Sequence, residues 1–322
     1  MRRNRVTIKD IALEARVTAQ TVSRVFRNQG YISKKTKAAV LAAADKLNYV
    51  PNNAAISLRM GKTKNIAVVF DCLVNVYFAV MIDYLHREVQ ARGYSLQTIF
   101  ADSPTITEEV YRSALSMGAV GVISFLEADD GLGVVVKNYG VPLLILGRRT
   151  DMQELDYLVT DDVQGGRLAA ERLLKDGCKS FAYVAEGLGV TCIDDRFKGF
   201  CDTLQSTGVA PLLIDNTKDL EEIFRSLQEE EKIPDGIFCS CDMVAFRFIS
   251  IMKKLGRGEV KVIGYDDLQS DIGFPFRITT IGVNKARYIA LALELFLPKV
   301  EDEKEDRIAE KAEVMLCEGF TA

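Results

Sequence analysis

"TIKDIALEARVTAQTVSRVF", residues 7–26, consists of two short amphipathic segments separated by a turn. Thr7 and Thr18 precede these segments, and Ser33 precedes a third one; a hydroxyl side chain in that position predicts a helix N-cap. The apolar residues of each segment recur three or four positions apart, which predicts that one face of each helix is buried. These residues are Ile8, Ile11, Ala12 and Ala15, then Val22 and Val25, then Val40, Ala43, Ala44 and Leu47.

The second segment is polar on the side that these apolar residues leave open. A helix that only closed a core would not need so many hydrogen-bonding groups there. Gln and Arg side chains carry forked donors and acceptors that match base edges in the DNA major groove, and hydroxyl groups can reach phosphates or bases. The pattern predicts a helix-turn-helix DNA-binding domain. The side chains expected to point outward are Gln20, Thr21, Ser23, Arg24 and Arg27.

Positive charge is concentrated in the first fifth of the chain. Residues 1–64 contain 14 Lys and Arg residues against Asp10, Glu14 and Asp45, which is a formal charge of +11. The whole chain of 322 residues carries −4, so the remainder carries −15. A small basic part joined to a large acidic one predicts a polyanionic partner for the basic part alone.

Residues 6–63, "VTIKDIALEARVTAQTVSRVFRNQGYISKKTKAAVLAAADKLNYVPNNAAISLRMGKT", resemble the DNA-binding head and hinge of the lactose-repressor (LacI/GalR) family without a gap. The resemblance implies a bacterial transcription regulator. It places Ala19 and Gln20 at the two main base-reading positions, with Arg24 and Arg27 beside them. The full set of implied DNA contacts is Thr7, Thr18, Ala19, Gln20, Thr21, Ser23, Arg24, Arg27, Tyr31, Asn52, Ala55, Leu58 and Arg59.

Residues 51–64 are expected to form a hinge helix and linker. Pro51 supplies a helix start, and the two turns that follow would be marginal as an isolated helix in water. The resemblance implies that this helix forms when two chains meet on DNA, with Leu58 wedged into the minor groove at the centre of a palindromic site. A plain linker, or Leu58 as a core residue, are the alternatives.

Two positions in the head depart from the family pattern. Arg16 occupies the turn between the first two helices, where the family usually has Gly. A residue other than Gly at a positive φ costs about 1 kcal/mol, and a phosphate contact by Arg16 could offset part of that. Ala19 is smaller than the residue that many relatives carry, so Gln20 and Arg24 are expected to supply more of the base discrimination.

From Asn65 onward, apolar strand-like runs alternate with amphipathic helical stretches. This alternation predicts an α/β fold with parallel sheets, and the length suggests two such units. The expected strands are 65–71, 94–101, 121–125, 142–147, 157–161, 180–186, 236–240 and 261–267, and helices are expected at 77–93, 164–177 and 194–208.

The same segment resembles the two-lobed, periplasmic-binding-protein-like effector domain of the family, more weakly than the head does. The predicted fold is thus an all-α helix-turn-helix head followed by an α/β two-lobed effector domain. We expect the head at 1–50, the hinge at 51–64 and the effector-binding and dimerisation domain at 65–322. Its first lobe is expected at about 65–161 and 282–300, and its second lobe at about 162–281 and 301–322.

Ligands of parallel α/β sheets bind beyond the carboxyl ends of the strands. By the family pattern Arg196 holds a ligand oxygen or carboxylate, and Asp266 accepts from hydroxyl or amine groups on the same ligand. A purely structural pair of Arg196 and Asp266 is the alternative. The full set of expected effector contacts is Asp71, Phe78, Gly147, Arg148, Arg196, Cys241, Asp242 and Asp266.

Several of these positions lack a polar group that relatives carry. Cys241 stands where the family has Asn, and Gly147 stands where some sugar-binding relatives have Asp. Val76 replaces the usual proline of the first loop. These changes favour a ligand with fewer hydroxyl groups than a hexose, a narrower pocket or a different pose.

Apolar helix faces around 77–92 and 281–297 predict a homodimer surface in addition to core; the residues concerned include Ala290, Leu291, Leu293, Leu295 and Phe296. The partners expected are therefore palindromic operator DNA, a small-molecule effector and a second copy of the chain.

Other classes of protein fit less well. The seven scattered cysteines contain no Cys-x-x-Cys and there is one histidine, so neither a zinc site nor a disulfide framework is expected. No catalytic or cofactor-binding fingerprint occurs, which argues against an enzyme with a DNA-binding appendage. The first residues lack the apolar core of an export signal, and no apolar run is long enough to cross a membrane. This argues against a solute-binding protein and predicts a cytoplasmic regulator without cofactor or catalytic residues.

Overall fold

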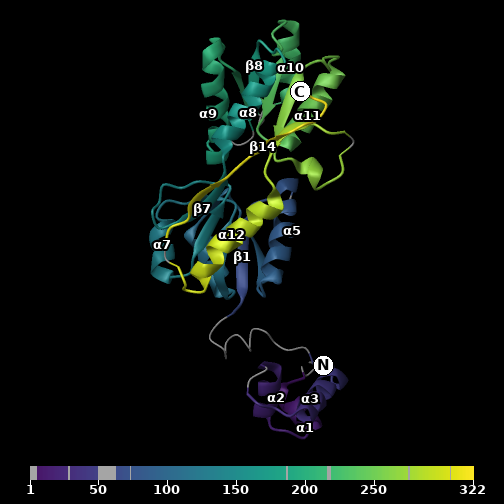
Figure 1. Ribbon diagram of the computed structural model, residues 1–322, viewed down its shortest axis with the longest axis vertical. Coiled ribbons are helices and arrows are strands. Elements are labelled where there is room, and N and C mark those ends of the chain that lie inside the picture. The colour runs from purple at the N-terminus through teal and green to yellow at the C-terminus, as the bar shows by residue number, and fades with distance from the viewer. Residues whose placement is uncertain are drawn as a thin grey trace. The chain divides into compact units, whose positions relative to one another are not determined.

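The computed structural model describes residues 6–27, 30–49, 63–72, 74–185, 188–215, 219–274, 276–304 and 306–322. The chain forms two compact units, which we call the head, Met1–Thr63, and the body, Lys64–Ala322 (Figure 1). The predicted hinge at 51–64 lies outside the described residues apart from its last two positions. Among the residues described, no helix is both long and apolar enough to cross a membrane.

The head contains the three predicted helices, α1 (Ile8–Glu14), α2 (Ala19–Arg27) and α3 (Lys34–Lys46). The predicted caps are confirmed. The Asp10 carboxylate accepts from the Thr7 backbone N–H at 2.7 Å, and Thr18 Oγ1 accepts from the backbone N–H of Thr21 at 3.1 Å. The Ser33 hydroxyl accepts from the backbone N–H of Thr36, also at 3.1 Å. The short helices thus have part of their open N–H groups satisfied locally.

The three helices bury one small core. Val22, Val40 and Ile11 are fully buried, and the Phe26 and Tyr49 rings pack at its edge with their centroids 5.7 Å apart. The inward stripe predicted for α2 is therefore confirmed. Its burial fixes which side of α2 faces outward, because a residue's direction from a helix is set by its position in the turn.

The turn between α1 and α2 has the backbone conformation that the family's glycine would favour. Arg16 has φ +53°, and its N–H donates to Leu13 O at 3.3 Å. The next N–H, that of Val17, donates to Ala12 O at 2.9 Å. This pair of bonds is the Schellman motif, in which the left-handed residue is usually Gly. Arg16 thus adopts the left-handed conformation of this turn although its Cβ atom is then crowded against the backbone.

Replacing Arg16 by Gly should therefore raise the free energy of unfolding of the head by about 1 kcal/mol, because Gly adopts this φ without strain. Thermal melts followed by circular dichroism would measure it. Asn48, with φ +49° in the equivalent turn after α3, is the matched control. Asn tolerates this region, so Asn48→Gly should have a smaller effect. A head that is destabilised by Arg16→Gly would contradict the prediction.

The first lobe of the body is a parallel six-stranded sheet in the order β13-β7-β6-β4-β1-β2. Its strands are β1 (Asn65–Phe70), β2 (Ser95–Phe100), β4 (Ala119–Ser124), β6 (Leu143–Leu146), β7 (Asp156–Thr160) and β13 (Ala309–Ala312). Helices α5 (Val76–Ala91) and α12 (Lys285–Val300) cover one face, and α6 (Glu108–Ser116) and α7 (Leu132–Tyr139) cover the other. A small parallel pair, β3 (Thr105–Ile106) and β5 (Glu127–Ala128), lies beside them.

The second lobe has a six-stranded sheet in the order β14-β12-β11-β10-β8-β9, parallel except for β14. Its strands are β8 (Phe181–Ala185), β9 (Leu212–Asp215), β10 (Gly236–Cys239), β11 (Lys261–Tyr265), β12 (Thr279–Gly282) and β14 (Met315–Cys317). Helices α8 (Asp162–Lys175) and α9 (Thr191–Leu204) cover one face, and α10 (Leu220–Glu229) and α11 (Asp242–Lys254) cover the other. Two 3-10 turns, η1 (Gln205–Thr207) and η2 (Leu268–Ser270), complete it.

The chain passes between the lobes after β7, after β12 and after β13. The predicted two-lobed α/β body is confirmed, but its boundary near the C-terminus was wrong. Residues 301–322 do not all belong to the second lobe, because β13 pairs in parallel with β7 of the first. The three-residue β14 then joins the second sheet. Both are edge strands of only four and three residues, too short for an apolar alternation that would assign them to a sheet.

The apolar segment at 281–297 was predicted as one helix, and this was also wrong at its start. Ile281 and Gly282 still belong to β12, and α12 begins only at Lys285, with the Asn284 side chain as its N-cap. Leu293 and Phe296 are fully buried against the first sheet. Figure 1 shows α12 and α5 on the same side of that sheet. Part of the predicted dimer surface is therefore core of the first lobe.

Candidate functional site

The outer side of α2 presents the residues expected to read DNA. Ala19, Gln20 and Arg24 are exposed, as is the preceding Thr18. The hydroxyls of Thr18 and Thr21 lie 2.9 Å apart and hydrogen-bond to each other. The short Ala19 side chain leaves Gln20 as the longest neutral donor and acceptor at the start of the helix, the end that enters the major groove in helix-turn-helix proteins.

Ser23 was predicted to lie on this outer side, and this prediction was wrong. It is 8% exposed, which classes it with the buried residues of the head. Successive helical residues are rotated by about 100°, so Ser23 lies about 60° from Phe26 around the helix axis. Phe26 packs at the edge of the core, and Ser23 is covered along with it. A DNA contact by the Ser23 side chain is not supported by this position.

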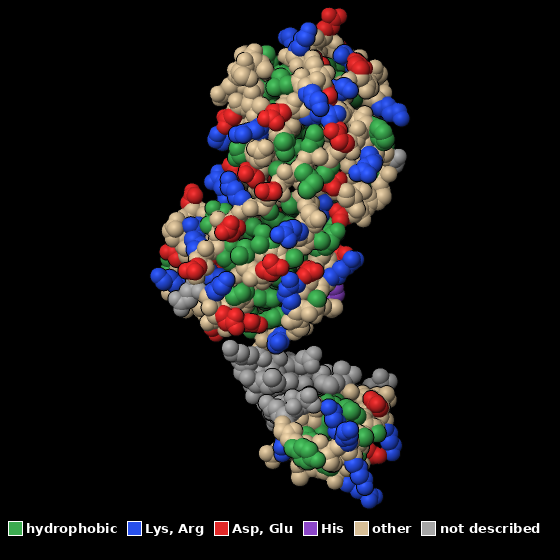
Figure 2. Space-filling model, viewed as in Figure 1, with side chains coloured by type: hydrophobic (Ala, Val, Ile, Leu, Met, Phe, Trp, Pro, Cys, Tyr) green, Lys and Arg blue, Asp and Glu red, His purple; other side chains and the backbone are tan. Residues whose placement is uncertain are grey.

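Charge on the head is consistent with the predicted polyanionic partner. Tyr31 is 93% exposed, and the Arg24 guanidinium lies against Gly30, which has φ +70°. On the face shown in Figure 2, the charged side chains of the head are mainly Lys and Arg, whereas those of the body are of both signs, intermixed. The predicted contacts at Asn52, Ala55, Leu58 and Arg59, and the side chain of Arg27, lie outside the described residues.

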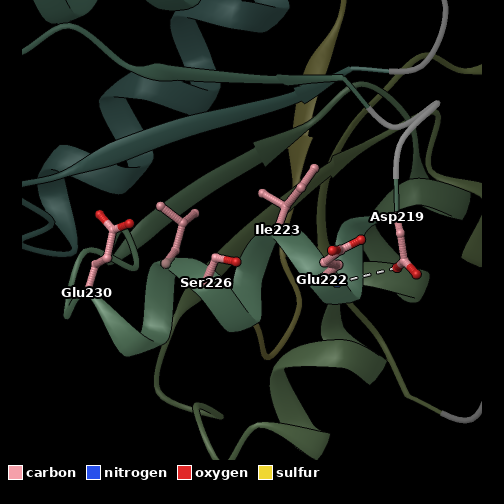
Figure 3. Close-up of a pocket in the computed structure, with 6 residues that line it drawn as sticks. Asp219, Glu222, Ile223, Ser226 and Glu230 are labelled. Atoms are coloured by element: carbon pink, nitrogen blue, oxygen red, sulfur yellow. Dashed lines mark hydrogen bonds between the residues drawn. The ribbon is translucent and has the colours of Figure 1, made fainter.

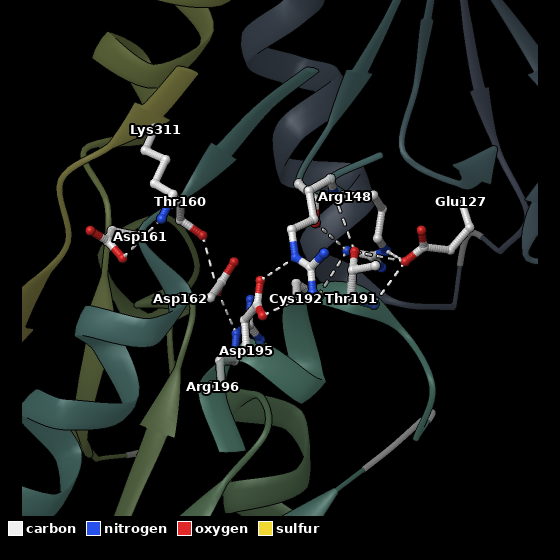
Figure 4. A network of polar contacts seen from close by, with 12 residues as sticks. Glu127, Arg148, Thr160, Asp161, Asp162, Thr191, Cys192, Asp195, Arg196 and Lys311 are labelled. Carbon is white, nitrogen blue, oxygen red and sulfur yellow. Dashed lines mark hydrogen bonds and ion pairs between the residues drawn. The ribbon is translucent and has the colours of Figure 1, made fainter. Parts of the chain in front are cut away.

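In the body, the carboxyl ends of several strands meet a helix start in a polar network between the lobes (Figure 4). Arg196 of α9 is at its centre on the second lobe. Its Nε donates to Asp162 Oδ1 at 2.8 Å, and its Nη1 donates to Ser240 O at 2.6 Å. The guanidinium carbon lies 3.5 Å from the centroid of the Tyr265 ring. Asp162 is thus the close carboxylate partner of Arg196, and Asp266, at 4.0 Å, is the distant one.

The first lobe contacts α9 directly through the segments that follow β4 and β6. Arg149 holds the Asp195 carboxylate with both its Nε and Nη2, at 2.8 and 3.2 Å. Glu127 Oε1 accepts from the backbone N–H and hydroxyl of Thr191 at 2.8 and 2.9 Å. These bonds join the two lobes at one end of their interface, as Figure 4 shows for Glu127 and Thr191.

Arg148 lies between these two contacts and reaches the second lobe. Its Nη1 donates to Gly147 O at 2.8 Å and to Cys192 Sγ at 3.0 Å. Burial raises the pKa of the Cys192 thiol, against the opposite effect of Arg148 and Arg196. The predicted residue Arg148 is thus brought to the same network as Arg196, with a neutral thiol between them.

Asp266 and Tyr77 complete this part of the interface. Burial raises the pKa of Asp266 to about 6, and Arg196 and Lys285 act in the opposite direction. Burial also raises the pKa of Tyr77, as does the Asp266 charge, while Arg196 and Arg148 lower it. Tyr77 therefore lies in the same electrostatic environment as the two predicted arginines. The sequence analysis named its neighbour Phe78 instead.

Phe78 belongs to the first-lobe core. It is 7% exposed and packs against the rings of Phe70 and Phe125, with centroid distances of 6.5 and 5.6 Å. Asp71 and Gly147 directly follow β1 and β6, so they lie at the carboxyl edge of the sheet, where both are partly exposed. The structure therefore places them at the predicted edge, but it assigns Phe78 a packing role.

Asp242, like Phe78, was predicted to contact the effector but has a structural role instead. Its side chain is fully buried, with Oδ1 accepting from the Thr280 hydroxyl at 2.5 Å and Oδ2 accepting from the Leu268 N–H at 2.7 Å. Burial raises the pKa of Asp242 well above its ordinary value. The carboxyl group joins α11 to β12 and η2, so both oxygens serve the second lobe itself. Cys241, the preceding N-cap residue of α11, is partly buried.

A second contact between the lobes was not predicted. Asp271, in the loop after η2, accepts from the Tyr84 hydroxyl of α5 at 2.7 Å and pairs with Lys285 of α12 at 2.8 Å. Lys285 also donates to Asp267 O at 2.9 Å. No local sequence signal links residues that lie nearly 190 positions apart, so only the folded chain could bring Tyr84 and Asp271 together. Residues that directly follow a strand could have been found from the sequence, because ligands of parallel α/β sheets bind beyond the carboxyl ends of the strands.

A separate pocket of about 640 Å³ lies on α10 of the second lobe (Figure 3). The lining residues are mainly acidic and apolar, and none of the predicted effector contacts is among them. Its residues are Asp219, Glu222, Ile223, Ser226, Leu227 and Glu230. The candidate effector site is therefore the interface between the lobes.

Comparison with known families agrees with both parts of the chain. The model for bacterial regulatory proteins of the lacI family matches residues 7–52, and that for the periplasmic binding protein-like domain matches residues 170–319. These matches support membership of the lacI family of bacterial regulatory proteins. This lacI-family member is therefore a DNA-binding transcription regulator, with the helix-turn-helix head and two-lobed body described above.

Two curated relatives match 81% and 96% of this lacI-family regulator. It is 28% identical over 272 residues to the ribose operon repressor of Halalkalibacterium halodurans, which covers 81% of this chain and 80% of that protein. It is also 28% identical over 327 residues to the HTH-type transcriptional repressor PurR of Mannheimia succiniciproducens, covering 96% and 97%. The structure of the lac repressor dimer bound to operator and the anti-inducer ONPF superposes with a TM-score of 0.85 at 22% identity over 99% of each chain. This last likeness shows a shared fold.

Proposed function

We propose that the protein is a transcription repressor whose affinity for a palindromic operator is controlled by a small molecule bound between the two lobes of the body. It acts as a homodimer, in the cytoplasm, by binding rather than by catalysis. The relatives named as repressors of a ribose operon and as PurR support a sugar or related metabolite as the effector class.

The observation that carries the proposal is the polar network between the lobes in a chain that also has a helix-turn-helix head. Arg148, Glu127 and Tyr77 come from the first lobe, and Arg196 and Asp266 come from the second. A molecule that contacts both sets would favour one separation of the lobes over another. Ligand control requires such a difference in affinity between two states.

Operator recognition is assigned to the outer side of α2. Gln20 and Arg24 supply the base-reading groups, while Ala19 makes room for Gln20 and contacts a thymine methyl. We assign phosphate contacts to Thr18 and Thr21, and another to Thr7, which precedes α1. The roles of Asn52, Ala55, Leu58 and Arg59 in the minor groove are proposed from the sequence alone.

Gln20→Ala should reduce affinity for the operator about 10- to 100-fold, because a good side-chain contact to a base contributes about 1–3 kcal/mol of discrimination. Gel shifts of the full-length protein on its own upstream region would measure this. Binding to an unrelated duplex is the control and should not change, since Gln20 carries no charge. A loss of the same size on both duplexes would contradict base reading by Gln20.

The same gel shift tests ligand control. A metabolite that raises the thermal midpoint of the protein should also change the dissociation constant for operator, by roughly 5- to 150-fold, because coupling between two sites is reciprocal. A metabolite that binds between the lobes without any change in operator affinity would argue against the proposed function. Sequence-specific binding that is absent under every ligand condition would do the same.

A further inference from the structure

Both hydrogen-bond acceptors of the partly buried Arg148 guanidinium are uncharged. Its side chain is 21% exposed, and Nη1 donates to the carbonyl of the preceding residue, Gly147, and to the Cys192 sulfur. A thiol sulfur is a weak hydrogen-bond acceptor. The closest carboxylate oxygen among the described residues, Glu127 Oε1, lies 3.7 Å from Arg148 Nε, which is beyond hydrogen-bonding distance.

Glu127 is already engaged elsewhere. The Oε1 atom that is nearest to Arg148 accepts both the N–H and the hydroxyl of Thr191. Moving this oxygen onto Arg148 would break the two bonds that join β5 to α9. The carboxylate therefore supplies a distant charge but no hydrogen bond to the guanidinium.

The other two arginines of the interface are well matched by comparison. Arg149 holds Asp195 at 2.8 Å, and Arg196 holds Asp162 at the same distance. Burial and the like charge of Arg196 lower the pKa of Arg148, but Cys192 and the Glu127 carboxylate raise it, and the pKa lies above its ordinary value. The thiol of Cys192, whose pKa is raised by burial, is neutral near pH 7. Arg148 therefore keeps its charge, and a bound anion would supply the hydrogen-bonded counter-ion that none of the described residues provides.

We infer that the effector carries an anionic group, a carboxylate or a phosphate, and that Arg148 binds it from the first lobe. This inference rests on the proposed function of the site between the lobes. The anion replaces the thiol contact by a charge-assisted, forked pair of hydrogen bonds. Arg196, whose Nε and Nη1 are occupied by Asp162 and Ser240, then contacts other oxygens of the same ligand. Arg148 is thus the residue that selects acidic metabolites over neutral ones.

The first test uses minimal anions on the full-length protein. Inorganic phosphate and acetate represent the two kinds of group, and potassium chloride at equal ionic strength is the reference. At concentrations well above its dissociation constant, one of them should raise the thermal midpoint of the wild type by roughly 2–4 °C more than that of Arg148→Met. Salts that are excluded from protein surfaces stabilise every folded protein. Subtracting the shift of the variant from that of the wild type removes this general effect. Equal shifts in both proteins, including no shift in either, would overturn the inference.

The second test separates binding from a structural role. Arg148→Met should leave the thermal midpoint in chloride nearly unchanged, because Arg148 makes no hydrogen-bonded ion pair with a described residue. Arg196→Met, which leaves the Asp162 carboxylate unpaired, should lower it sharply. A fall in Arg148→Met as large as that in Arg196→Met would show that Arg148 holds the lobes together and would overturn its role in binding.

The third test uses matched metabolites: glucose, gluconate and glucose 6-phosphate, and ribose with ribose 5-phosphate. At least one acidic member should bind the wild type ten or more times more tightly than its neutral counterpart, and Arg148→Met should lose that preference. A neutral sugar that binds both proteins equally and shifts operator affinity would overturn the anionic class while leaving effector control intact. An acidic ligand that depends on Arg148 but never changes operator binding would support the inference and contradict the proposed function.

Discussion

Asp162→Ala should lower the free energy of unfolding by about 3–5 kcal/mol, the range expected when one partner of a buried ion pair is removed. Asp162 and Arg196 have side chains that are 3% and 10% exposed, and their atoms lie 2.8 Å apart. Without Asp162, the guanidinium keeps its bond to Ser240 O and its contact with the Tyr265 ring, but its nearest carboxylate is Asp266 at 4.0 Å. The charge would then be buried without a close counter-ion.

Asp195→Ala is the matched control. Asp195 also pairs with an arginine at 2.8 Å, but the side chains of Arg149 and Asp195 are 43% and 22% exposed. Solvent screens such a pair, which should contribute only about 0–1 kcal/mol. Urea denaturation of the two variants and the wild type would measure the difference. Equal losses in both variants would contradict the argument that burial, rather than the contact itself, sets the size of the effect.

Gly199→Ala should have the second large effect on stability, about 3 kcal/mol, at the upper end of the range for overpacked positions. The helices α8 and α9 approach with their backbones in contact. A Cβ atom built on Gly199 would overlap the carbonyl oxygen of Val163, and one built on Gly166 would overlap the carbonyl oxygen of Arg196. Backbone atoms cannot move aside as a flexible side chain can, so the helices would have to separate.

This separation would also displace the candidate site, because α8 carries Asp162 and α9 carries Arg196. Gly258→Ala is the control, since no heavy atom lies within 4 Å of a Cβ built there. Its effect should stay within about 0.5 kcal/mol. Thermal and urea unfolding of both variants would test the difference. A Gly199→Ala protein as stable as Gly258→Ala would show that the helices have room to adjust.

The head could be predicted nearly completely from the sequence because its structure is local. Thr7, Thr18 and Ser33 cap helices through bonds to residues three positions away. The inward positions of Val22 and Val25 follow from helical spacing. Ser23 was the exception, since its burial depends on how Phe26 packs at the core edge, and periodicity alone does not show this.

The body was predictable where strands are long and apolar. All eight predicted strands form, and the helices after them cover the sheets. The edge strands β13 and β14 escaped prediction because runs of four and three residues are too short to give a periodic signal. The predicted site residues Arg148, Arg196 and Asp266 do come together, whereas Asp242 and Phe78 turn out to be packing residues.

The sequence by itself determined the kind of protein: a basic helix-turn-helix head joined to an acidic α/β body with strand-end arginines and carboxylates. Charge, capping and periodicity are short-range properties, so they can be read along the chain. Only the tertiary structure decided which acceptor each arginine receives. Arg196 takes Asp162 and Arg149 takes Asp195, while Arg148 is left with a thiol. These pairings depend on loops brought together from different strands and lobes, and distances between such segments are set by packing of the whole body.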